Sequence, residues 1–468
     1  MARSRANALL LFLLALTIGC RHETPSSHQP PPDLAQLALS DIALSFTTPV
    51  GQASRAQTVT LTNSGTAVLA LSSVTIRDTS YAMTSTCGAT LAPSASCTLS
   101  ITFKPQTASD LPSAIIISDN DPQTPHTIRL NGTGTSASSA AVPAAQTPPV
   151  TYTLYTVPET DKTITPLYAL INAAQKSIDM TMYALQDTTF VNDLLAACKR
   201  GVTVRVILDQ NNEKPGNTSA FTQLNGQQNC SAVWANKAFQ ATHQKSLVID
   251  GTQAAIMSLN LESRDYSTTR DFAILENDPA DVSAIEATFN ADFAAGTTST
   301  GTSGASDFSF FPDLGNHLIW SPTTAQTAMV SLIANAKKTL LIENEELATS
   351  ATAILSALET ACKKGVQVQL AMVNNTDYAA GFTAITQAGC SIHTYPNTTT
   401  GFYIHAKAVV ADYGLPTQNA YMGSINYSNA SMNSNRELGM YVTDAATITS
   451  IHDTMLADYN GGTPYAAK

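Results

Sequence analysis

The second part of this chain contains an internal repeat, and this repeat constrains the fold more than any other feature. The stretch Ala196–Val204 (AACKRGVTV) recurs as Thr360–Val368 (TACKKGVQV), and each copy ends an amphipathic helix pattern. The glycine in each copy is a typical helix stop, and the Val-x-Val after it is typical of a buried strand. Because strands alternate with helices in both copies, the repeat predicts two α/β lobes. The expected helices are Phe190–Lys199 and Ala353–Lys363, and the expected strands before them are Ser177–Tyr183 and Thr339–Asn344.

Each copy of the repeat also carries the same polar motif, His-x-Lys-x4-Asp. A histidine and a lysine two positions apart on a strand point to the same face of the sheet. Apolar residues follow each pair, which is typical of a buried strand that holds the pair rigidly. A Ser-x-Asn then follows on a further strand. The residues are His243, Lys245, Asp250, Ser258 and Asn260 in the first copy and His405, Lys407, Asp412, Ser424 and Asn426 in the second.

These residue types suit the chemistry of a phosphodiester, whose negative charge repels anionic nucleophiles. The ammonium groups of Lys245 and Lys407 can neutralise the non-bridging oxygens, and the amides of Asn260 and Asn426 can donate further hydrogen bonds. Neutral imidazole is a nucleophile at about pH 7, and a second, protonated imidazole can donate to the leaving oxygen. One His-x-Lys is weak evidence, but two copies at equivalent places in a repeat predict one shared catalytic site.

The doubled motif resembles the HKD pattern of the phospholipase D superfamily, and the resemblance covers residues 152–459. It implies two lobes related by a pseudo-twofold axis, with the two motifs facing each other at their interface. It also implies a two-step reaction through a phosphohistidine, with no metal or other cofactor. In that reaction His243 is the nucleophile and His405 is the acid and then the base. The residues themselves do not order the two histidines.

Each histidine needs a partner that orients its second ring nitrogen. The resemblance assigns this role to a downstream carboxylate, and Asp271 and Glu437 occupy that place in the two copies. The alternative interpretation of both is a surface charge on an edge strand. Asp250 and Asp412 are included in the predicted site, where we expect them to support the strand ends rather than to react.

The two copies differ at some positions near the motifs. The Gly-Ser of the family is present as Gly423-Ser424, but the first copy has Met257 before Ser258, and we expect Met257 to reshape its side of the pocket. The acidic segment Glu343–Glu346 resembles a paired-carboxylate site, but it is interpreted as a pocket rim or a solvated loop.

The cysteines can be paired with the help of the repeat. Six cysteines other than Cys20 allow fifteen pairings. In each copy one cysteine ends a helix and another begins a strand, so the economical pairing is Cys198–Cys230, Cys362–Cys390 and Cys87–Cys97. Buried free thiols are the alternative. A zinc site is disfavoured because no CxxC spacing is present.

The start of the chain is typical of an export signal. Arg3 and Arg5 precede the apolar run Ala8–Ile18, which is too short to span a bilayer as a helix. The following Gly19-Cys20 resembles a bacterial lipoprotein box, which implies lipidation of Cys20. The alternative is a plain cleaved signal. Arg21 after the cysteine implies, by resemblance, sorting to the outer membrane in a Gram-negative cell.

Short alternating strands precede the repeat. Examples are Thr58–Thr62, Ser100–Phe103 and Ala114–Ile117, and several such strands at this spacing suggest a β-sandwich. The stretch Cys87–Cys97, with Phe103-Lys104-Pro105 and Asn131–Gly134, resembles the immunoglobulin-like ASH or choice-of-anchor D modules of bacterial surface proteins. No catalytic set of residues is found there, so a spacer or adhesion module is expected.

These observations predict a multidomain chain in which an all-β immunoglobulin-like sandwich precedes an α/β phospholipase D-like domain of two pseudo-twofold-related lobes. Both motifs lie on one chain, so a monomer suffices for the site. The expected organisation is a signal peptide (1–20), a flexible stalk (21–36), the β-sandwich (37–134), a linker (135–150), lobe 1 (151–295), an inter-lobe connection (296–312) and lobe 2 (313–468).

Charge helps to choose among substrates. The chain has 24 Lys and Arg and 35 Asp and Glu; seven of each kind lie before residue 151, so all the excess acid lies in the lobes. An acidic domain gains little from counterion release, which disfavours nucleic acid. The leading prediction is therefore an exported hydrolase of phospholipid head groups, anchored by lipid in the bacterial envelope at the outer membrane or periplasmic face, or otherwise secreted. The alternatives are an endonuclease of the same superfamily and a non-catalytic surface binding protein.

Overall fold

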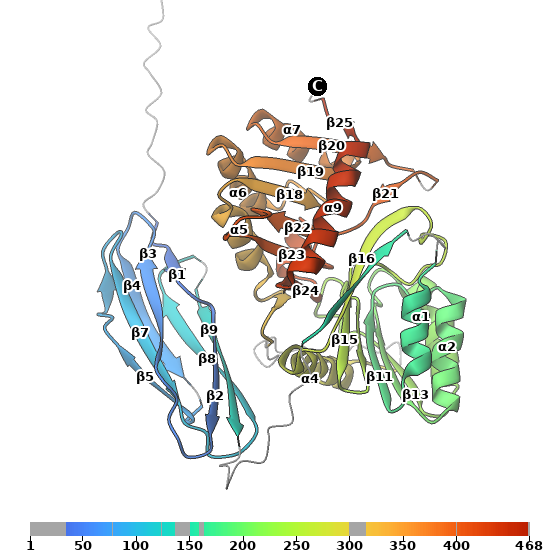
Figure 1. The fold of residues 1–468 in the computed structure, drawn as a ribbon, viewed down its shortest axis with the longest axis horizontal. Coiled ribbons are helices and arrows are strands. Elements are labelled where there is room, and N and C mark those ends of the chain that lie inside the picture. Colours follow the sequence, from blue (N-terminus) through green and yellow to red (C-terminus); the bar gives the residue numbers. More distant parts are fainter. Residues whose placement is uncertain are drawn as a thin grey trace, which may run out of the picture.

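A computed structural model describes residues 34–135, 150–158, 163–298 and 315–466, apart from residues 77, 123 and 399. Figure 1 shows an all-β domain in blue beside two α/β lobes, the first in green and yellow and the second in orange and red. The immunoglobulin-like sandwich and the two-lobed α/β domain expected from the sequence are both present. The predicted export signal, Cys20, and most of the stalk, linker and inter-lobe connection lie outside the described residues.

The N-terminal domain is a sandwich of two sheets, in the orders β1-β3-β7-β5 and β2-β9-β8-β4-β6. Alternate residues of the strands face inward, as in β7, where Cys97, Leu99, Ile101 and Phe103 are all buried. The strands are β1 (Leu37–Leu39), β2 (Ala43–Pro49), β3 (Gln57–Asn63), β4 (Leu69–Ile76), β5 (Tyr81–Ser85), β6 (Thr90–Leu91), β7 (Ser96–Phe103), β8 (Asp110–Asp119) and β9 (His126–Thr135).

Lobe 1 has a mixed sheet in the order β10-β16-β15-β14-β11-β12-β13. Strands β11, β12 and β13 are parallel and linked by helices, whereas β14, β15, β16 and β10 are antiparallel. The elements are β10 (Tyr152–Val157), α1 (Thr165–Ala173), β11 (Ser177–Met182), α2 (Thr188–Lys199), β12 (Thr203–Leu208), α3 (Lys214–Asn225), β13 (Cys230–Trp234), β14 (Ser246–Ile249), β15 (Gln253–Met257), β16 (Thr269–Glu276) and α4 (Pro279–Ala295).

Lobe 2 repeats this sheet in the equivalent order β17-β24-β23-β22-β18-β19-β20, with β25 added at its edge. The repeat therefore predicted the α/β fold of both lobes. The elements are β17 (Leu318–Ser321), α5 (Ala325–Asn335), β18 (Thr339–Glu343), α6 (Thr352–Lys363), β19 (Gln367–Asn374), the 3-10 helix η2 (Thr376–Tyr378), α7 (Ala379–Gln387), β20 (Ser391–Pro396), β21 (Tyr403–Ile404), β22 (Ala408–Ala411), β23 (Asn419–Gly423), α8 (Asn429–Asn433), β24 (Glu437–Val442), α9 (Ala445–Gly461) and β25 (Thr463–Pro464).

The repeated helices end where the sequence predicts. Helix α2 ends at Lys199 and helix α6 at Lys363, one residue before the Arg or Lys that precedes each glycine. Gly201 has φ +95° and Gly365 has φ +86°, a backbone conformation that glycine adopts without steric cost. Each glycine therefore turns the chain from the helix into the next parallel strand.

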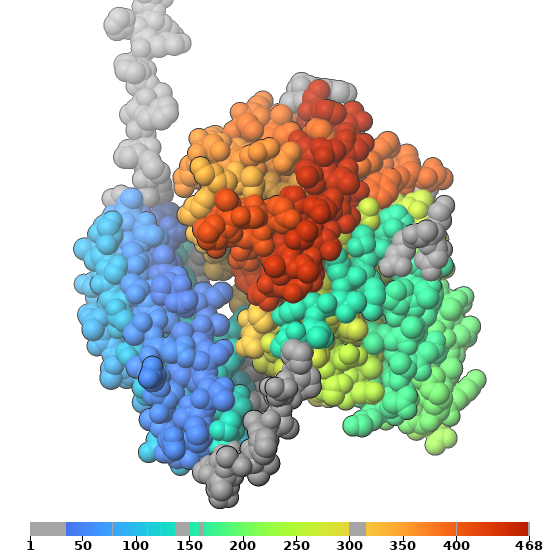
Figure 2. Space-filling model, viewed as in Figure 1, coloured from blue at the N-terminus to red at the C-terminus, as the bar shows by residue number. Residues whose placement is uncertain are grey.

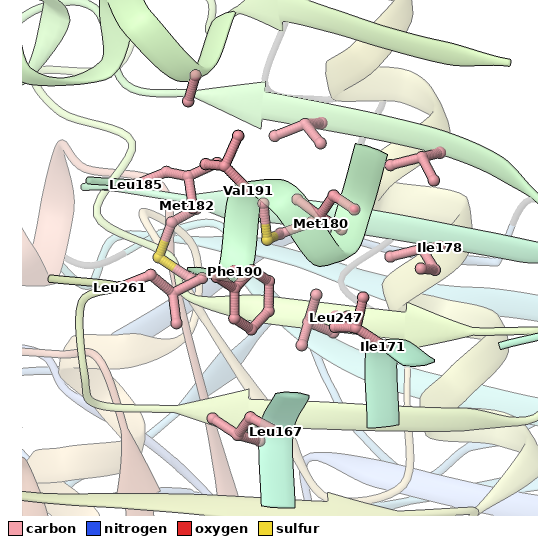
Figure 3. Packing of buried hydrophobic residues seen from close by; sticks show 14 of the residues in the cluster. Leu167, Ile171, Ile178, Met180, Met182, Leu185, Phe190, Val191, Leu247 and Leu261 are labelled. Carbon is pink, nitrogen blue, oxygen red and sulfur yellow. The ribbon is translucent and has the colours of Figure 1, made fainter. Parts of the chain in front are cut away.

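Three large apolar cores, beside a small cluster under helix α4, hold the described parts of the two lobes. On the outer face of the lobe 1 sheet, helix residues such as Phe190 and Leu167 pack on strand residues such as Met180 and Leu247 (Figure 3). Lobe 2 has an equivalent outer core. The inner faces of the two sheets share a third core, in which Phe272 of lobe 1 packs with residues such as Leu438 of lobe 2. Burial at this interface is favoured by the hydrophobic effect, so the lobes form one body, with lobe 2 directly on lobe 1 in Figure 2.

The three predicted disulfides are present. Cys198 is bonded to Cys230, Cys362 to Cys390, and Cys87 to Cys97. In the two lobes the bond joins the end of a helix to the start of a strand, across sequence separations of 32 and 28 residues. Closing loops of this length contributes ~3–4 kcal/mol to stability in the chain-entropy model.

The β-sandwich contacts the α/β domain through a buried arginine. Arg129 on β9 donates hydrogen bonds to the carbonyl of Leu318 at 3.2 Å and to the hydroxyl of Thr324 at 3.1 Å. These contacts attach the sandwich to the first strand of lobe 2 and to the start of helix α5. Among the described residues, no helix is both long and apolar enough to cross a membrane.

Candidate active site

The two His-x-Lys segments enter the site beside strands of the opposite lobe. Strand β21, which leads into His405, pairs with β16 of lobe 1, where Ile404 lies opposite Arg270. At the equivalent place before His243, the backbone of Thr242 forms an isolated parallel β-bridge with Arg436 of lobe 2. Each histidine therefore follows a residue that is held against the strand carrying the other lobe's carboxylate.

This arrangement of the two segments forms two histidine–carboxylate pairs, each between one lobe and the other. His243 Nδ1 lies 2.8 Å from Glu437 Oε2, and His405 Nδ1 lies 2.9 Å from Asp271 Oδ1. Glu437 and Asp271 are buried, so the surface-charge alternative is wrong for both. Because each pair joins one lobe to the other, neither lobe alone has a histidine with its orienting carboxylate.

The two serines of the Ser-x-Asn motifs donate hydrogen bonds to these carboxylates. Ser258 Oγ donates to Asp271 Oδ1 at 2.6 Å, and Ser424 Oγ donates to Glu437 Oε2 at 2.7 Å. Both serines are fully buried. They were predicted among the catalytic residues, but they lie behind the carboxylates and hold them in place.

Lys245 and Lys407 are brought together at the centre of the site. Lys245 Nζ donates to the carbonyl of His243 at 2.7 Å, and Lys407 Nζ donates to that of His405. Both lysines are fully buried. Burial, together with the nearby Lys407, lowers the pKa of Lys245 to about 7. A bound anion would stabilise the charged form of this lysine.

Asn260 and Asn426 lie on the cavity walls as expected. Asn260 Nδ2 is 3.2 Å from Glu262 Oε2, and Asn426 Nδ2 is 3.4 Å from Glu345 Oε2. The Oδ1 atom of each asparagine is buried without a hydrogen-bond partner among the described residues. Each Nδ2 carries two N–H groups and has one acceptor among the described residues, so each amide has an N–H left for a phosphate oxygen.

Asp250 and Asp412 lie at the opposite strand ends from the histidines. The carboxylate of Asp250 accepts backbone N–H bonds from residues 175–177, and that of Asp412 from residues 337–339. Both aspartates have positive φ, +54° and +52°. They fix the turn after β14 or β22 to the start of β11 or β18, in agreement with the expectation that they support the strand ends rather than react.

Two cavities meet at His405. One, of about 260 Å³, is lined by Tyr266 and Tyr403 among others, and the second, of about 410 Å³, by His243 and Asn426. His405 and Glu345 line both cavities, so these residues lie where the cavities join. The arrangement can hold a phosphate at the join and the two groups esterified to it on either side.

The acidic segment at the end of β18 lies closer to the histidines and lysines than its interpretation as a pocket rim or a solvated loop implies. Glu343 and Asn344 are buried, so this part is not a solvated loop. Glu345 lies inside the site, with Oε2 3.0 Å from Lys407 Nζ and 3.5 Å from His405 Nε2. Its place relative to the first copy follows from strand register, which becomes known only with the structure.

Met257 does not reshape the pocket as expected. Its side chain belongs to the outer core of lobe 1 and is fully buried. In lobe 2 a Cβ on Gly423 would lie 2.3 Å from the Cα of Gly439, and a Cβ on Gly439 equally close to the ring of Tyr421. The smaller Ala255 occupies the place of Tyr421 in lobe 1, which leaves room for a methionine.

Outside the cleft, one group of described residues has the composition of a cation site. Asp278, Asp281 and His317 place ligand atoms within 4.8 Å of one another. However, Asp281 accepts the backbone N–H groups of Asn316 and His317 and pairs with His317 Nδ1 at 2.9 Å. Hydrogen bonds within the chain therefore account for this group.

A duplicated α/β lobe with two lysines and two crosswise histidine–carboxylate pairs in one cleft defines a phospholipase D-like protein. The family model described as "Cardiolipin synthase, PLD-like domain" matches residues 167–293 and 329–459, once in each lobe and over more than half of the chain. The chain therefore belongs to the phospholipase D-like family. A second model, an Ig-like domain of the HYDIN/CFA65/VesB-like type, matches residues 35–133.

Individual relatives match only part of the chain. It is 29% identical over 136 residues to the major cardiolipin synthase ClsA of Bacillus subtilis, which is 28% of this chain and 26% of the relative. It is 28% identical over 130 residues to the probable cardiolipin synthase YwiE of the same organism, which is 27% and 25% of the two chains. The chain thus spans about a quarter of the length of these relatives.

A solved structure extends the likeness across both lobes. The phosphatidylserine synthase of Haemophilus influenzae Rd KW20 superposes with a TM-score of 0.53 at 12% identity, over 66% of this chain and 86% of that one. At this identity the likeness concerns the fold.

Proposed function

We propose that this chain is an exported phosphodiesterase that hydrolyses phospholipid head groups through a phosphohistidine intermediate. The observation that carries the proposal is the crosswise pairing of His243 with Glu437 and of His405 with Asp271 around two buried lysines. Each carboxylate binds Nδ1, so Nε2 of His243 is left for the substrate, while Nε2 of His405 lies 3.5 Å from Glu345 Oε2 where the two cavities join. The two histidines can therefore take the two complementary roles that phosphoryl transfer needs.

The asymmetry of the site supports the order of these roles. Burial lowers the pKa of His243, which favours the neutral ring that a nucleophile needs. His405 instead lies between two carboxylates, Asp271 at Nδ1 and Glu345 at Nε2, so the proposal gives it the proton-transfer role.

The reaction then has two balanced steps. The Nε2 lone pair of His243 forms a bond to phosphorus, the bond to the leaving oxygen breaks, and that oxygen takes the proton of His405. Next, water attacks phosphorus while His405 takes its proton, and the phosphorus–nitrogen bond breaks with its electron pair returning to His243. Lys245 and Lys407 hold the non-bridging oxygens in both steps.

Charge in the cleft supports a lipid over a nucleic acid. Carboxylates of Asp265, Glu345 and Glu346 line the two cavities. These charges oppose the repeated phosphates that flank the cleavage position in DNA, whereas a phospholipid presents a single phosphate. The endonuclease alternative requires the phosphate backbone of DNA to lie along these carboxylates.

The experiment offers purified protein three substrates: phospholipid vesicles, bis(p-nitrophenyl) phosphate and DNA. We expect release of the head group with phosphatidic acid from the vesicles and p-nitrophenol from the diester. Cleavage of DNA without lipid turnover would favour the endonuclease, and DNA binding that weakens steeply with salt would support it.

Transfer to an alcohol is the second candidate, and the matching cardiolipin synthases favour it. An alcohol in place of water would attack the same intermediate and yield a new phosphodiester. Glycerol or a short alcohol added to the vesicle assay separates the two outcomes. Phosphatidic acid as the main product supports hydrolysis, whereas a phosphatidyl alcohol as the main product supports transfer.

The pH profile of kcat/KM is expected to be a narrow bell. Activity should rise with pH through a range below the ordinary pKa of histidine, because burial lowers the pKa of His243, which must lose its proton to attack. It should fall above about pH 7, because Lys245 then loses the charge that binds the phosphate. Initial rates at low substrate concentration measure both limbs.

Lys245→Arg provides the control for the alkaline limb. Because the guanidinium stays charged throughout this range, the limb should move to higher pH in the variant, even where the maximal rate falls. A bound phosphate anion should also raise the lysine pKa, so the alkaline limb of kcat should lie above that of kcat/KM. A limb that Lys245→Arg leaves in place would contradict the assignment.

Export and lipid anchoring are part of the same proposal. The Arg3–Cys20 segment supports it, as do the three disulfides, because disulfides persist in oxidising compartments. Expressed in a Gram-negative host, the mature protein should begin at Cys20, carry acyl chains and sediment with membranes. Cys20→Ser should release it to the soluble fraction. Mass spectrometry of the N-terminal peptide showing an unmodified Cys20 in the wild type would contradict the anchor.

A further inference from the structure

The residue after the central strand differs between the two lobes. Strand β11 pairs with β14 in the same register as β18 pairs with β22, shifted by 162 residues, as Ile178↔Ile249 and Leu340↔Ala411 show. The same shift relates Tyr183 to Glu345. These two residues therefore occupy equivalent places, each against the His-x-Lys pair of its own lobe.

Tyr183 and Glu345 give the His-x-Lys pairs of the two lobes different electrostatic surroundings. In lobe 1 the ring of Tyr183 lies 4.6 Å from the ring of His243, and Lys245 Nζ lies 4.9 Å from its centre. In lobe 2 a carboxylate replaces the ring, with Glu345 Oε2 3.0 Å from Lys407 Nζ. One ammonium group thus faces a neutral ring, while the other already has an anionic partner.

The carboxylate of Glu345 is held in this place from both sides. Tyr403 donates its hydroxyl to Oε1 at 3.0 Å, and Asn426 Nδ2 lies 3.4 Å from Oε2. Burial would raise the pKa of Glu345, but the adjacent Lys407 and His405 lower it well below its ordinary value. The group is therefore ionised at neutral pH, at the join of the two cavities.

A fixed negative charge beside the phosphate position discriminates between ligands by their charge. A phosphodiester carries one negative charge, whereas a phosphomonoester with a second pKa of about 6 carries nearly two at pH 8. The repulsion from Glu345 grows in proportion to the ligand charge. A doubly charged phosphomonoester is thus penalised about twice as much, in free energy, as a singly charged diester.

We propose that Glu345 is a specificity-determining residue that makes the site prefer singly charged phosphodiesters over doubly charged phosphomonoesters. It does so by compensating the charge of Lys407 while leaving that of Lys245 for the substrate. The inference rests on the proposed function, in which hydrolysis converts a lipid phosphodiester into a phosphomonoester. Glu345 then weakens the binding of the product relative to the substrate and limits product inhibition.

The test compares Glu345→Gln with the wild type at about pH 7, where Lys245 keeps part of its charge and a phosphomonoester is already mostly doubly charged. Methyl phosphate is the doubly charged ligand and dimethyl phosphate the singly charged one. Binding is measured by thermal-shift titration, which needs no turnover. Because the repulsion doubles with ligand charge, a gain of about threefold for dimethyl phosphate should accompany one of about tenfold for methyl phosphate. In the vesicle assay, phosphatidic acid should inhibit the variant at lower concentration than the wild type.

Glu346→Gln is the matched control, because Glu346 lines one of the same cavities but, among the described residues, has no ion pair like those of Glu345 with Lys407 and His405. We expect it to change the ratio of the two affinities less than Glu345→Gln does. The inference would be overturned if Glu345→Gln raised the affinity for both ligands equally or for neither. It would also be overturned if Glu346→Gln changed the ratio of the two affinities as much as Glu345→Gln does. Absence of phosphodiester hydrolysis by the wild type would instead refute the proposed function, and the binding contrast would still decide the role of Glu345.

Discussion

The His405→Ala protein, given a phosphodiester with a good leaving group, is expected to accumulate a phosphoryl adduct on His243. The nucleophile and its Glu437 partner, 2.8 Å away, remain intact in this variant. A good leaving group needs little protonation, so the first step proceeds. The second step is slow because no base activates the water. Product should appear in a burst, and intact mass spectrometry after rapid quench should show an acid-labile adduct.

His243→Ala is the matched variant and should show neither the burst nor the adduct. With the lipid substrate, both variants should lose about 10⁴-fold or more in turnover, because the two residues serve one coupled cycle and their losses do not add. An adduct on His405 in the His243→Ala protein would reverse the two roles. Substantial lipid turnover by both variants would refute the shared site.

Most of the fold follows from the repeat. A helix stop at Gly201 and Gly365, followed by a buried Val-x-Val strand, fixes the direction of the chain in both lobes. The pairing of the cysteines in the lobes also follows from the repeat, because the end of α2 and the start of β13 must be close when β12 and β13 are parallel neighbours. Local patterns are sufficient here because each element contacts its neighbours in sequence.

The pairing across the lobes could not be predicted in the same way. The sequence indicates that Asp271 and Glu437 orient the histidines, but not which carboxylate serves which ring. That choice depends on how β21 lies against β16, which is a contact between segments more than 130 residues apart. Such contacts are set by the packing of complete lobes rather than by a local pattern.

Differences between the copies are harder to interpret than their similarities. The replacement of glycine by Met257 suggested an altered pocket, but a smaller Ala255 beside it compensates within the core. By contrast, Glu345 had no obvious partner in the sequence, because its contacts, Lys407, Tyr403 and Asn426, lie about sixty to eighty residues away. Burial and charge at a position become visible only when its neighbours are known.

The crosswise pairs make a further strong prediction about the carboxylates. Glu437→Gln and Asp271→Asn keep the shape of each side chain but remove the charge that stabilises a protonated or phosphorylated imidazole. By analogy with the aspartate of a serine–histidine–aspartate triad, each should lower kcat/KM for the lipid by about 10³- to 10⁴-fold. The hydrogen bonds from Ser424 to Glu437 and from Ser258 to Asp271 should help to keep the substituted side chains in place.

The two carboxylate variants should differ in how they respond to the leaving group. Glu437 serves His243, so Glu437→Gln should impair attack itself, and an activated diester should restore little activity and no burst. Asp271 serves His405, so Asp271→Asn should recover most of the first step with the same diester and show the adduct on His243. Stopped-flow release of p-nitrophenol measures both. The reverse pattern would show that each carboxylate acts on the histidine of its own lobe, because only then would loss of Glu437 mimic loss of His405.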